Sequence, residues 1–333
     1  MRVLVTGVAG FIGAAVARHL LKRGDEVIGI DNLSDYYDVT LKEARLRWVT
    51  AAAPHAFSFK KTDFSNAAAL HAGLDQETFD AIIHLGAQAG VRHSLENPAA
   101  YVQANLVGHS NMLELARQRE VRHFVYASSS SVYGGNTKLP FSVEDRVDHP
   151  LSLYAATKKA DELMSEAYAH LYRLPQTGLR FFTVYGPWSR PDMMMWIFTK
   201  RILAGEPIPV FNEGNMWRDF TYIDDVVKGV ASCLDSPPPD DGATKAGGSA
   251  KPHALYNIGH SKPEQLLQVI GLLEDACGRR AHIQMMPIQP GDVERTFADI
   301  DAIRTEHGFE PATPLEVGVP RFVRWFREYT GSW

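Results

Sequence analysis

Tyr154 and Lys158 are the residues of this chain of 333 amino acids whose types and spacing most clearly suggest acid–base chemistry. They stand four positions apart, so a helix running from about 154 to 172 and stopping before Pro175 would place phenol and ammonium on one face. A fixed positive charge beside a tyrosine favours the phenolate, which makes the side chain a usable proton carrier near neutral pH. A surface pair without function has the same spacing, so the motif needs support from its surroundings.

A run of four serines, 128–131, precedes Val-Tyr-Gly and follows a strand expected over Phe124–Ala127. Ligands bind at the carboxyl edge of such strands in open α/β sheets. A serine hydroxyl there could hydrogen-bond the substrate oxygen that gains or loses a proton. A plain polar loop is the alternative, but it fits poorly beside the Tyr–Lys pair and the glycine motif near the N-terminus.

Residues 7–13 read Gly-Val-Ala-Gly-Phe-Ile-Gly and lie between an expected strand, Val3–Val5, and an expected helix, 14–22. Glycines placed this way permit a tight turn, close approach of the backbone to a pyrophosphate, and close packing of helix on strand. The helix N-terminus then offers free N–H groups and the positive end of its dipole to the phosphates. The cofactor residues predicted from this motif are Gly7, Gly10, Phe11, Ile12 and Gly13.

Asp31 ends the second expected strand, Glu26–Ile30. A carboxylate there can accept hydrogen bonds from the adenosine ribose and would repel a 2′-phosphate, so NAD is favoured over NADP. Asn32 is assigned to the same site, and Asp63, after a third short strand, is a candidate partner for the adenine amino group. A role in forming a turn is the alternative for both aspartates.

The elements that must position these residues alternate between short β-rich runs and helical patterns, which is typical of βαβ units. The strands, including Ala81–Leu85, are continuous apolar runs of the kind buried on both faces. A further helix is expected over 104–118. The sequence therefore predicts an α/β fold with a Rossmann-type doubly wound parallel sheet and a smaller C-terminal substrate-binding domain.

The predicted NAD-binding domain covers residues 1–181, with a return of the chain to it around 220–260. Residues 182–219 and 261–333, where Pro, aromatic residues and Met become frequent, would form the substrate-binding domain. The stretch 236–252 is rich in Pro, Gly, Asp and Ser and predicts an exposed, mobile loop.

The composition excludes several classes of function. The hydrophobic fraction of 45% is ordinary for a globular protein, and the net charge of −5 argues against broad nucleic-acid binding. No apolar run suits a membrane span or a signal peptide, so we expect a cytoplasmic protein. Cys233 and Cys277 form no CxxC pair and the thirteen histidines show no HExxH spacing, so neither a disulfide scaffold nor a metal site is expected.

At this point the chain resembles the extended short-chain dehydrogenase/reductase family, over nearly its whole length and with the motifs in family order. Within it, the sequence is most similar to the UDP-glucuronate 4-epimerases. The segments that carry the likeness are Asp31–Asp38, Gln88–Arg92, Arg180–Pro187, Pro191–Met193, Arg218–Asp225 and Pro290–Val293. Two positions depart from the family pattern: Gly86 stands where relatives commonly have Ala, and Ser189 where they commonly have Gly.

The resemblance implies an isomerase that uses NAD without consuming it. Tyr154 would take the proton of the sugar 4-hydroxyl while hydride leaves C4, Ser129 would assist, and Lys158 would hold the nicotinamide ribose. The 4-keto sugar would turn and accept the hydride on its other face, so that UDP-glucuronate and UDP-galacturonate interconvert.

Ser130 and Ser131 bear on the choice among related chemistries. The 4,6-dehydratases have Asp and Glu at these positions, and the decarboxylases usually have Glu at the second, because their reactions need extra proton transfers. Two serines disfavour both reactions. UDP-glucose 4-epimerase remains the first alternative, followed by UDP-glucuronate decarboxylase, and a catalytically silent NAD-binding protein is the alternative from another class.

A uronate substrate also requires a carboxylate site, because a 4-keto-uronate is a β-keto acid that readily loses CO₂. Arg190 is the family-matched clamp, since a guanidinium can bind a carboxylate through two hydrogen bonds; a solvent salt bridge is its alternative. Thr183 stands where UDP-glucose 4-epimerases typically have Asn. The remaining substrate candidates are Ser130 and Ser131 for the carboxylate, Arg218 and Arg295 for the diphosphate, Phe211 for uracil or else the core, and Arg92 from the matched segment.

The expected partners are the UDP-sugar and a second copy of the chain. Related enzymes form homodimers in which the helices corresponding to 104–118 and 154–172 pair across a two-fold axis. Packing of these helices inside one subunit is the alternative.

Overall fold

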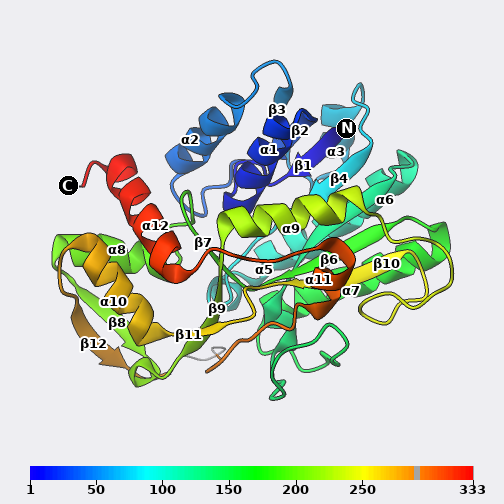
Figure 1. The fold of residues 1–333 in the computed structure, drawn as a ribbon. Coiled ribbons are helices and arrows are strands. Elements are labelled where there is room, and N and C mark those ends of the chain that lie inside the picture. The colour runs from blue at the N-terminus through cyan, green and yellow to red at the C-terminus, as the bar shows by residue number, and fades with distance from the viewer. Residues whose placement is uncertain (289–292, 333) are drawn as a thin grey trace.

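The computed structural model describes residues 1–288 and 293–332 and is organised around a seven-stranded parallel sheet (Figure 1). In spatial order the strands are β10 (His253–Ile258), β6 (Gln176–Phe181), β5 (His123–Ser129), β4 (Ala81–His84), β1 (Arg2–Thr6), β2 (Glu26–Asp31) and β3 (Phe57–Lys61). The chain order reverses between β1 and β4, and open α/β sheets bind ligands at the carboxyl edge of such a switch point. The predicted doubly wound α/β fold is confirmed.

Helices cover both faces of this sheet, because its strands are apolar on both sides. Val5 of β1 belongs to one hydrophobic core with Val230, whereas its neighbour Leu4 belongs to a second core with Leu113. The first face is covered by α1 (Phe11–Arg23), α2 (Val39–Thr50) and α9 (Ile223–Asp235), and the second by α3 (Ala67–Leu74), α6 (Gly108–Gln118) and α7 (Leu153–Tyr172).

The later part of the chain forms a smaller group of elements beside the sheet (Figure 1). It contains β7 (Thr183–Tyr185), α8 (Met194–Ala204), β8 (Pro207–Phe211), β9 (Trp217–Tyr222), β11 (Pro263–Gln265), α10 (Leu266–Cys277), β12 (His282–Met286) and α12 (Leu315–Thr330). Its two small sheets have the orders β11-β9-β7 and β12-β8. A further helix, α11 (Asp301–His307), packs against α9 and β10. The division into two domains stays a proposal.

The helix predicted over 104–118 is part of a longer helical run. The short helices α4 (His93–Glu96) and α5 (Pro98–Tyr101) precede a π-helical segment, η1 (Val102–Val107), which leads into α6. Within η1, the side chain of Asn105 bonds the backbone N–H and C=O of Gln88 and, at 3.0 Å, the hydroxyl of Thr157 in α7. Short π segments are frequent at functional sites, and this one ties the chain after β4 to the helix that carries Tyr154.

The boundaries of α7 agree with the helix predicted over 154–172. Ser152 caps its N-terminus, because the side-chain oxygen accepts the N–H of Ala155 at 3.1 Å. Arg173 ends it in the left-handed conformation, with φ of 56°, and Pro175 follows. The first turn of this helix is thereby fixed at the sheet edge.

The segment 236–252 contains no helix or strand. It is nevertheless attached to the body of the protein: Asp240 pairs with Arg173, and the N–H of Gly247 donates to Glu144 at 2.8 Å. In the part of the chain that the structure describes, no helix combines the length and the apolar character needed to cross a membrane.

Candidate active site

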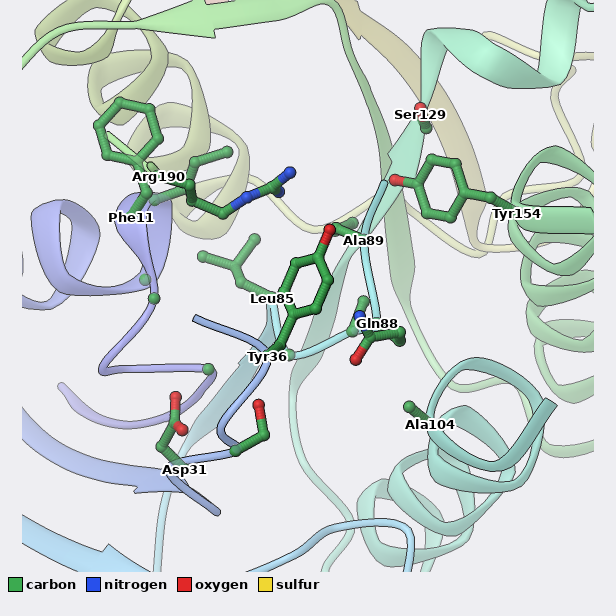
Figure 2. Close-up of a pocket in the computed structure, with 18 of the residues that line it drawn as sticks. Phe11, Asp31, Tyr36, Leu85, Gln88, Ala89, Ala104, Ser129, Tyr154 and Arg190 are labelled. Atoms are coloured by element: carbon green, nitrogen blue, oxygen red, sulfur yellow. The ribbon is translucent and has the colours of Figure 1, made fainter. Parts of the chain in front are cut away.

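A cavity of about 930 Å³ opens at the carboxyl edge of the large sheet (Figure 2). The nine residues predicted for the cofactor all line it: Gly7, Gly10, Phe11, Ile12, Gly13, Asp31, Asn32, Asp63 and Lys158. Ser129, Tyr154, Thr183 and Arg190 line it as well. The fold therefore brings together motifs that are far apart in the sequence.

The glycine-rich loop between β1 and α1 has no room for a side chain at Gly7 or at Gly13. Gly7 has φ of 67°, and a Cβ there would lie 2.8 Å from the backbone of Gly86. A Cβ on Gly13 would lie 2.1 Å from the carbonyl oxygen of Gly7. Gly86 itself is explained by packing, because a Cβ there would lie 2.5 Å from the ring of Phe64. These contacts bring bare backbone and the start of α1 to the cavity wall, as a pyrophosphate site requires.

The two predicted cofactor aspartates are held by hydrogen bonds. Asp31 is buried, and its two oxygens accept the backbone N–H groups of Ala9 at 3.1 Å and Leu33 at 2.8 Å. Each oxygen keeps a further lone pair for a ribose hydroxyl. Asp63 accepts the side-chain amide of Asn32 at 3.1 Å; burial raises the pKa of Asp63, but the hydrogen bonds it accepts outweigh burial and lower the pKa overall.

Lys42 of α2 also lines the cavity, and the sequence analysis did not identify it. Its Nζ donates to Ser34 at 2.9 Å and lies 4.9 Å from the centre of the Tyr37 ring, and burial lowers its pKa. No spacing rule marks a lysine at this point of a helix, because its approach depends on how the preceding loop folds back. The close glycine backbone, the buried Asp31 and this ammonium together fit a dinucleotide.

Tyr154 projects from the first turn of α7, and Figure 2 shows its hydroxyl pointing into the cavity near Ser129. The Ser129 oxygen accepts the N–H of Ser131 at 3.1 Å, so its own hydrogen remains available to a ligand. Lys158, one turn along α7, donates to Asp161 at 2.6 Å, with both side chains buried. Burial raises the pKa of Asp161 to about 6, against the opposing effect of Lys158.

A second buried ion pair, between Glu162 and Arg180, joins α7 to strand β6. Glu162 accepts Nε and Nη2 of Arg180 at 2.8 and 2.9 Å and the hydroxyl of Ser128 at 2.7 Å. Burial would raise the pKa of Glu162, but Arg180 outweighs it and the pKa falls to about 2. Arg180 also donates to the Tyr133 hydroxyl at 3.1 Å. The Arg180 guanidinium thus connects α7 with the turn after β5, and Glu162 connects α7 with the end of β5.

A smaller cavity, of about 210 Å³, adjoins the first and shares Ser129, Tyr154 and Thr183 with it. Three of the residues predicted to bind the substrate line this second cavity: Ser130, Ser131 and Arg218. The Ser131 oxygen is buried and, within the described residues, has no hydrogen-bond partner, which leaves it available to a ligand. The three shared residues stand where the two cavities meet.

Arg190, in the loop before α8, extends its guanidinium across the large cavity (Figure 2). Its Nε and Nη2 donate to the two oxygens of Asp192 at 2.9 and 2.8 Å, and the Tyr36 hydroxyl donates to the same carboxylate at 3.3 Å. Burial would lower the pKa of Arg190, but Asp192 outweighs it and raises the pKa. Nη1 has no partner among the described residues, so one end of the guanidinium can still bind a carboxylate.

Three predicted substrate residues lie outside the lining of both cavities. The guanidinium of Arg92 lies 4.9 Å from the centre of the Phe211 ring, and that of Arg295 lies 5.0 Å from a ring of Trp217. Their roles stay predictions. Residues 290–292 of the motif Pro290–Val293 lie outside the described residues.

Comparisons with known proteins agree with this geometry. Residues 3–259 match the model of the NAD dependent epimerase/dehydratase family. A probable UDP-glucuronate 4-epimerase of Rhizobium meliloti (strain 1021) is 47% identical over 332 residues, which cover 98% of this chain and 97% of the relative.

Two solved structures have closely similar folds. One is UDP-glucuronic acid 4-epimerase from Bacillus cereus in complex with UDP-glucuronic acid and NAD, with a TM-score of 0.87 and 31% identity, covering 99% of this chain and 100% of that one. The other is UDP-glucose 4-epimerase from Thermotoga maritima with UDP-glucose, with a TM-score of 0.86, 29% identity and the same coverage.

Proposed function

Because the chain belongs to the NAD dependent epimerase/dehydratase family, we propose that it is an NAD-dependent isomerase that interconverts UDP-glucuronate and UDP-galacturonate at C4. The observation that carries the proposal is the meeting of the two cavities at Ser129, Tyr154 and Thr183. A sugar held there would lie between a dinucleotide site on one side and a hydroxyl-lined substrate cavity on the other.

The chain's own residues would carry the protons of this reaction. Tyr154 accepts the proton of the sugar 4-hydroxyl and returns it when the opposite face has been reduced, and Ser129 hydrogen-bonds the same oxygen. Lys158, which lines the cavity, would hold the nicotinamide ribose. When bound, NAD supplies an acceptor and donor of hydride for C4. Arg218, in the second cavity, would hold the diphosphate while the sugar turns.

Selection of a uronate over a neutral hexose would depend on the polar groups near the boundary between the two cavities. Thr183, Ser130 and Ser131 can donate hydroxyl hydrogens to a carboxylate, and the free Nη1 of Arg190 can add a charged donor. In a 4-keto-uronate the C5–C6 bond breaks when it lies parallel to the carbonyl π system. Fixing the carboxylate out of that orientation protects the intermediate, and no carboxylic acid stands at 130 or 131 to promote proton transfer.

Proton NMR of the purified protein incubated with UDP-glucuronate tests the proposal. We expect the signals of UDP-galacturonate to grow until the two sugars are at equilibrium. A UDP-pentose product would indicate a decarboxylase, and turnover of UDP-glucose with UDP-glucuronate untouched would indicate a UDP-glucose 4-epimerase. If no UDP-sugar is converted and none produces reduced nicotinamide absorbance, the protein is not an enzyme of this class.

We propose in addition that the enzyme is a homodimer and acts in the cytoplasm. Val107, Leu163 and Leu171 are large apolar side chains that are exposed on η1 and α7, which supports pairing of these helices with a second copy. The free thiols of Cys233 and Cys277 suit a reducing compartment. Light scattering on the intact protein and on Leu171→Glu tests the first proposal: a dimer that becomes a monomer in the variant supports it, and a monomeric wild type refutes it.

A further inference from the structure

Arg45 of α2 is fully buried, and all of its N–H groups are used in hydrogen bonds. Nε and Nη2 donate to the carbonyl of Trp188 at 3.0 and 2.8 Å, and Nη2 also donates to the carbonyl of Ser189 at 3.1 Å. Nη1 donates to the carbonyl of Ala9 at 3.1 Å and to the Tyr37 hydroxyl. A guanidinium has five N–H donors in a planar fork, and this arrangement uses every one.

The acceptors around Arg45 are neutral, and no carboxylate among the described residues forms a salt bridge with it. Burial lowers its pKa. Burying a cation without an opposite charge costs free energy. We therefore look for the role of Arg45 in the backbone segments that its hydrogen bonds fix in position. Lysine could not substitute, because a flexible ammonium has three donors at one point and cannot span acceptors on three separate segments.

The three segments that Arg45 joins all border the large cavity. Ala9 is in the glycine-rich loop, Tyr37 is in the loop after β2, and Trp188 and Ser189 directly precede Arg190. Trp188 has φ of 68°, a left-handed conformation that is strained for a bulky residue. Two of the five hydrogen bonds go to its carbonyl, so Arg45 stabilises the turn from which Arg190 enters the cavity.

We propose that Arg45 is a positioning residue for the reaction: it fixes the backbone before Arg190 relative to the glycine-rich loop and thereby sets where the carboxylate of the substrate is held. This rests on the proposed function. Loss of these five hydrogen bonds would leave the hexose and the nucleotide bound but would let the carboxylate move until the C5–C6 bond lies parallel to the carbonyl π system. In the 4-keto intermediate the C5–C6 electron pair would then pass to C5 as CO₂ leaves, and a proton from water would complete the 4-keto-pentose. Return of the hydride first taken from C4 would reduce this ketone to a UDP-pentose.

The test compares Arg45→Lys with Arg47→Lys, which changes an exposed arginine on the same helix and serves as the control. Binding of UDP-glucuronate and of UDP-glucose is measured by calorimetry, and products from UDP-glucuronate are measured by NMR. For Arg45→Lys we expect the Kd of UDP-glucuronate to rise about tenfold, that of UDP-glucose to change less than threefold, and the UDP-pentose share to increase several-fold. Arg47→Lys should match the wild type.

Equal losses of affinity for both sugars, or an unchanged product ratio, would overturn the proposal and leave Arg45 a purely structural residue. If Arg45→Lys does not fold, Tyr37→Phe decides: it removes one acceptor of the fork, so the UDP-pentose share should rise by a smaller factor, and an unchanged share refutes the idea. Failure of the proposed function can be distinguished from failure of this proposal, because in the first case the wild type itself would make no UDP-galacturonate.

Discussion

The charged side chains on the two walls of the large cavity have different kinds of partner. On the wall formed by α7, β5 and β6, the buried charges are paired within the chain: Lys158 with Asp161 and Glu162 with Arg180. On the wall formed by α2 and the loop before α8, the cations bind mostly neutral groups. Lys42 donates to a hydroxyl and Arg45 to carbonyls and a phenol.

This difference indicates what each wall does. The wall with paired charges would carry the proposed proton-transfer groups, and its internal ion pairs hold the surrounding side chains in place without a ligand. The other wall would face the pyrophosphate and the substrate carboxylate, and its positive charge is left for anions that arrive with the ligands. Arg190 is intermediate, since Asp192 occupies two of its nitrogens and leaves Nη1 without a partner among the described residues.

Replacing Tyr154 with Phe should have the largest effect on activity. The change removes the hydroxyl of the proposed proton carrier and leaves the ion-paired residues around it in place. We expect kcat for epimerisation to fall by about 10²–10⁴-fold with the Kd of UDP-glucuronate nearly unchanged, as measured by NMR and calorimetry. Tyr168→Phe is the control, since its hydroxyl, on the same helix, donates to Glu114 instead. A loss below tenfold would mean that another group carries the proton.

Glu162→Gln tests the paired wall through stability. The change leaves Arg180 buried without its counter-charge, and we expect the free energy of unfolding in urea to fall by about 3–5 kcal/mol. Glu166→Gln, one turn further along α7, alters a half-exposed carboxylate that bonds His253 and should cost about 1 kcal/mol or less. Equal effects of the two changes would contradict the assignment of the main stabilising pair to Glu162.

The same pair predicts a pH dependence. The pKa of Glu162 is about 2 in the folded protein, against an ordinary value of 4.5. Its contribution of about 3 kcal/mol is present above the ordinary pKa and is lost as pH falls from near 4.5 towards 2. The stability gap between wild type and Glu162→Gln should therefore shrink over that interval, and a gap that stays constant down to pH 2.5 would disprove the linkage.

Arg190→Ala tests the other wall, where the smallest effect is expected and only with ligand present. Loss of one charged hydrogen-bond donor should raise KM for UDP-glucuronate by about tenfold and increase CO₂ release, while stability without ligand changes little. Lys200→Ala, an exposed position on α8, is the control. An Arg190 variant with wild-type affinity and product ratio would remove the clamp from the site.

Motifs that act through neighbours along the chain could be predicted from the sequence. The glycine-rich loop, Asp31 and the Tyr154–Lys158 pair depend on a turn, a strand end and one helical face, and these are local properties. Lys42, Arg45 and Asp192 could not be found in this way, because nothing in their own segments indicates which backbone or side chain they meet. The π-helical form of η1 could not be predicted either. Asn105 within it bonds Gln88 and Thr157, which lie on two other segments of the chain.

The order and types of the motif residues alone determined the α/β fold and the dinucleotide site, because hydrophobic periodicity and glycine geometry are encoded locally. Only the tertiary structure decided which charges are paired and which remain available to ligands. The reason is that electrostatic attraction depends on distance and burial, and these are set by how α2, α7 and the loop before α8 come together around the sheet edge.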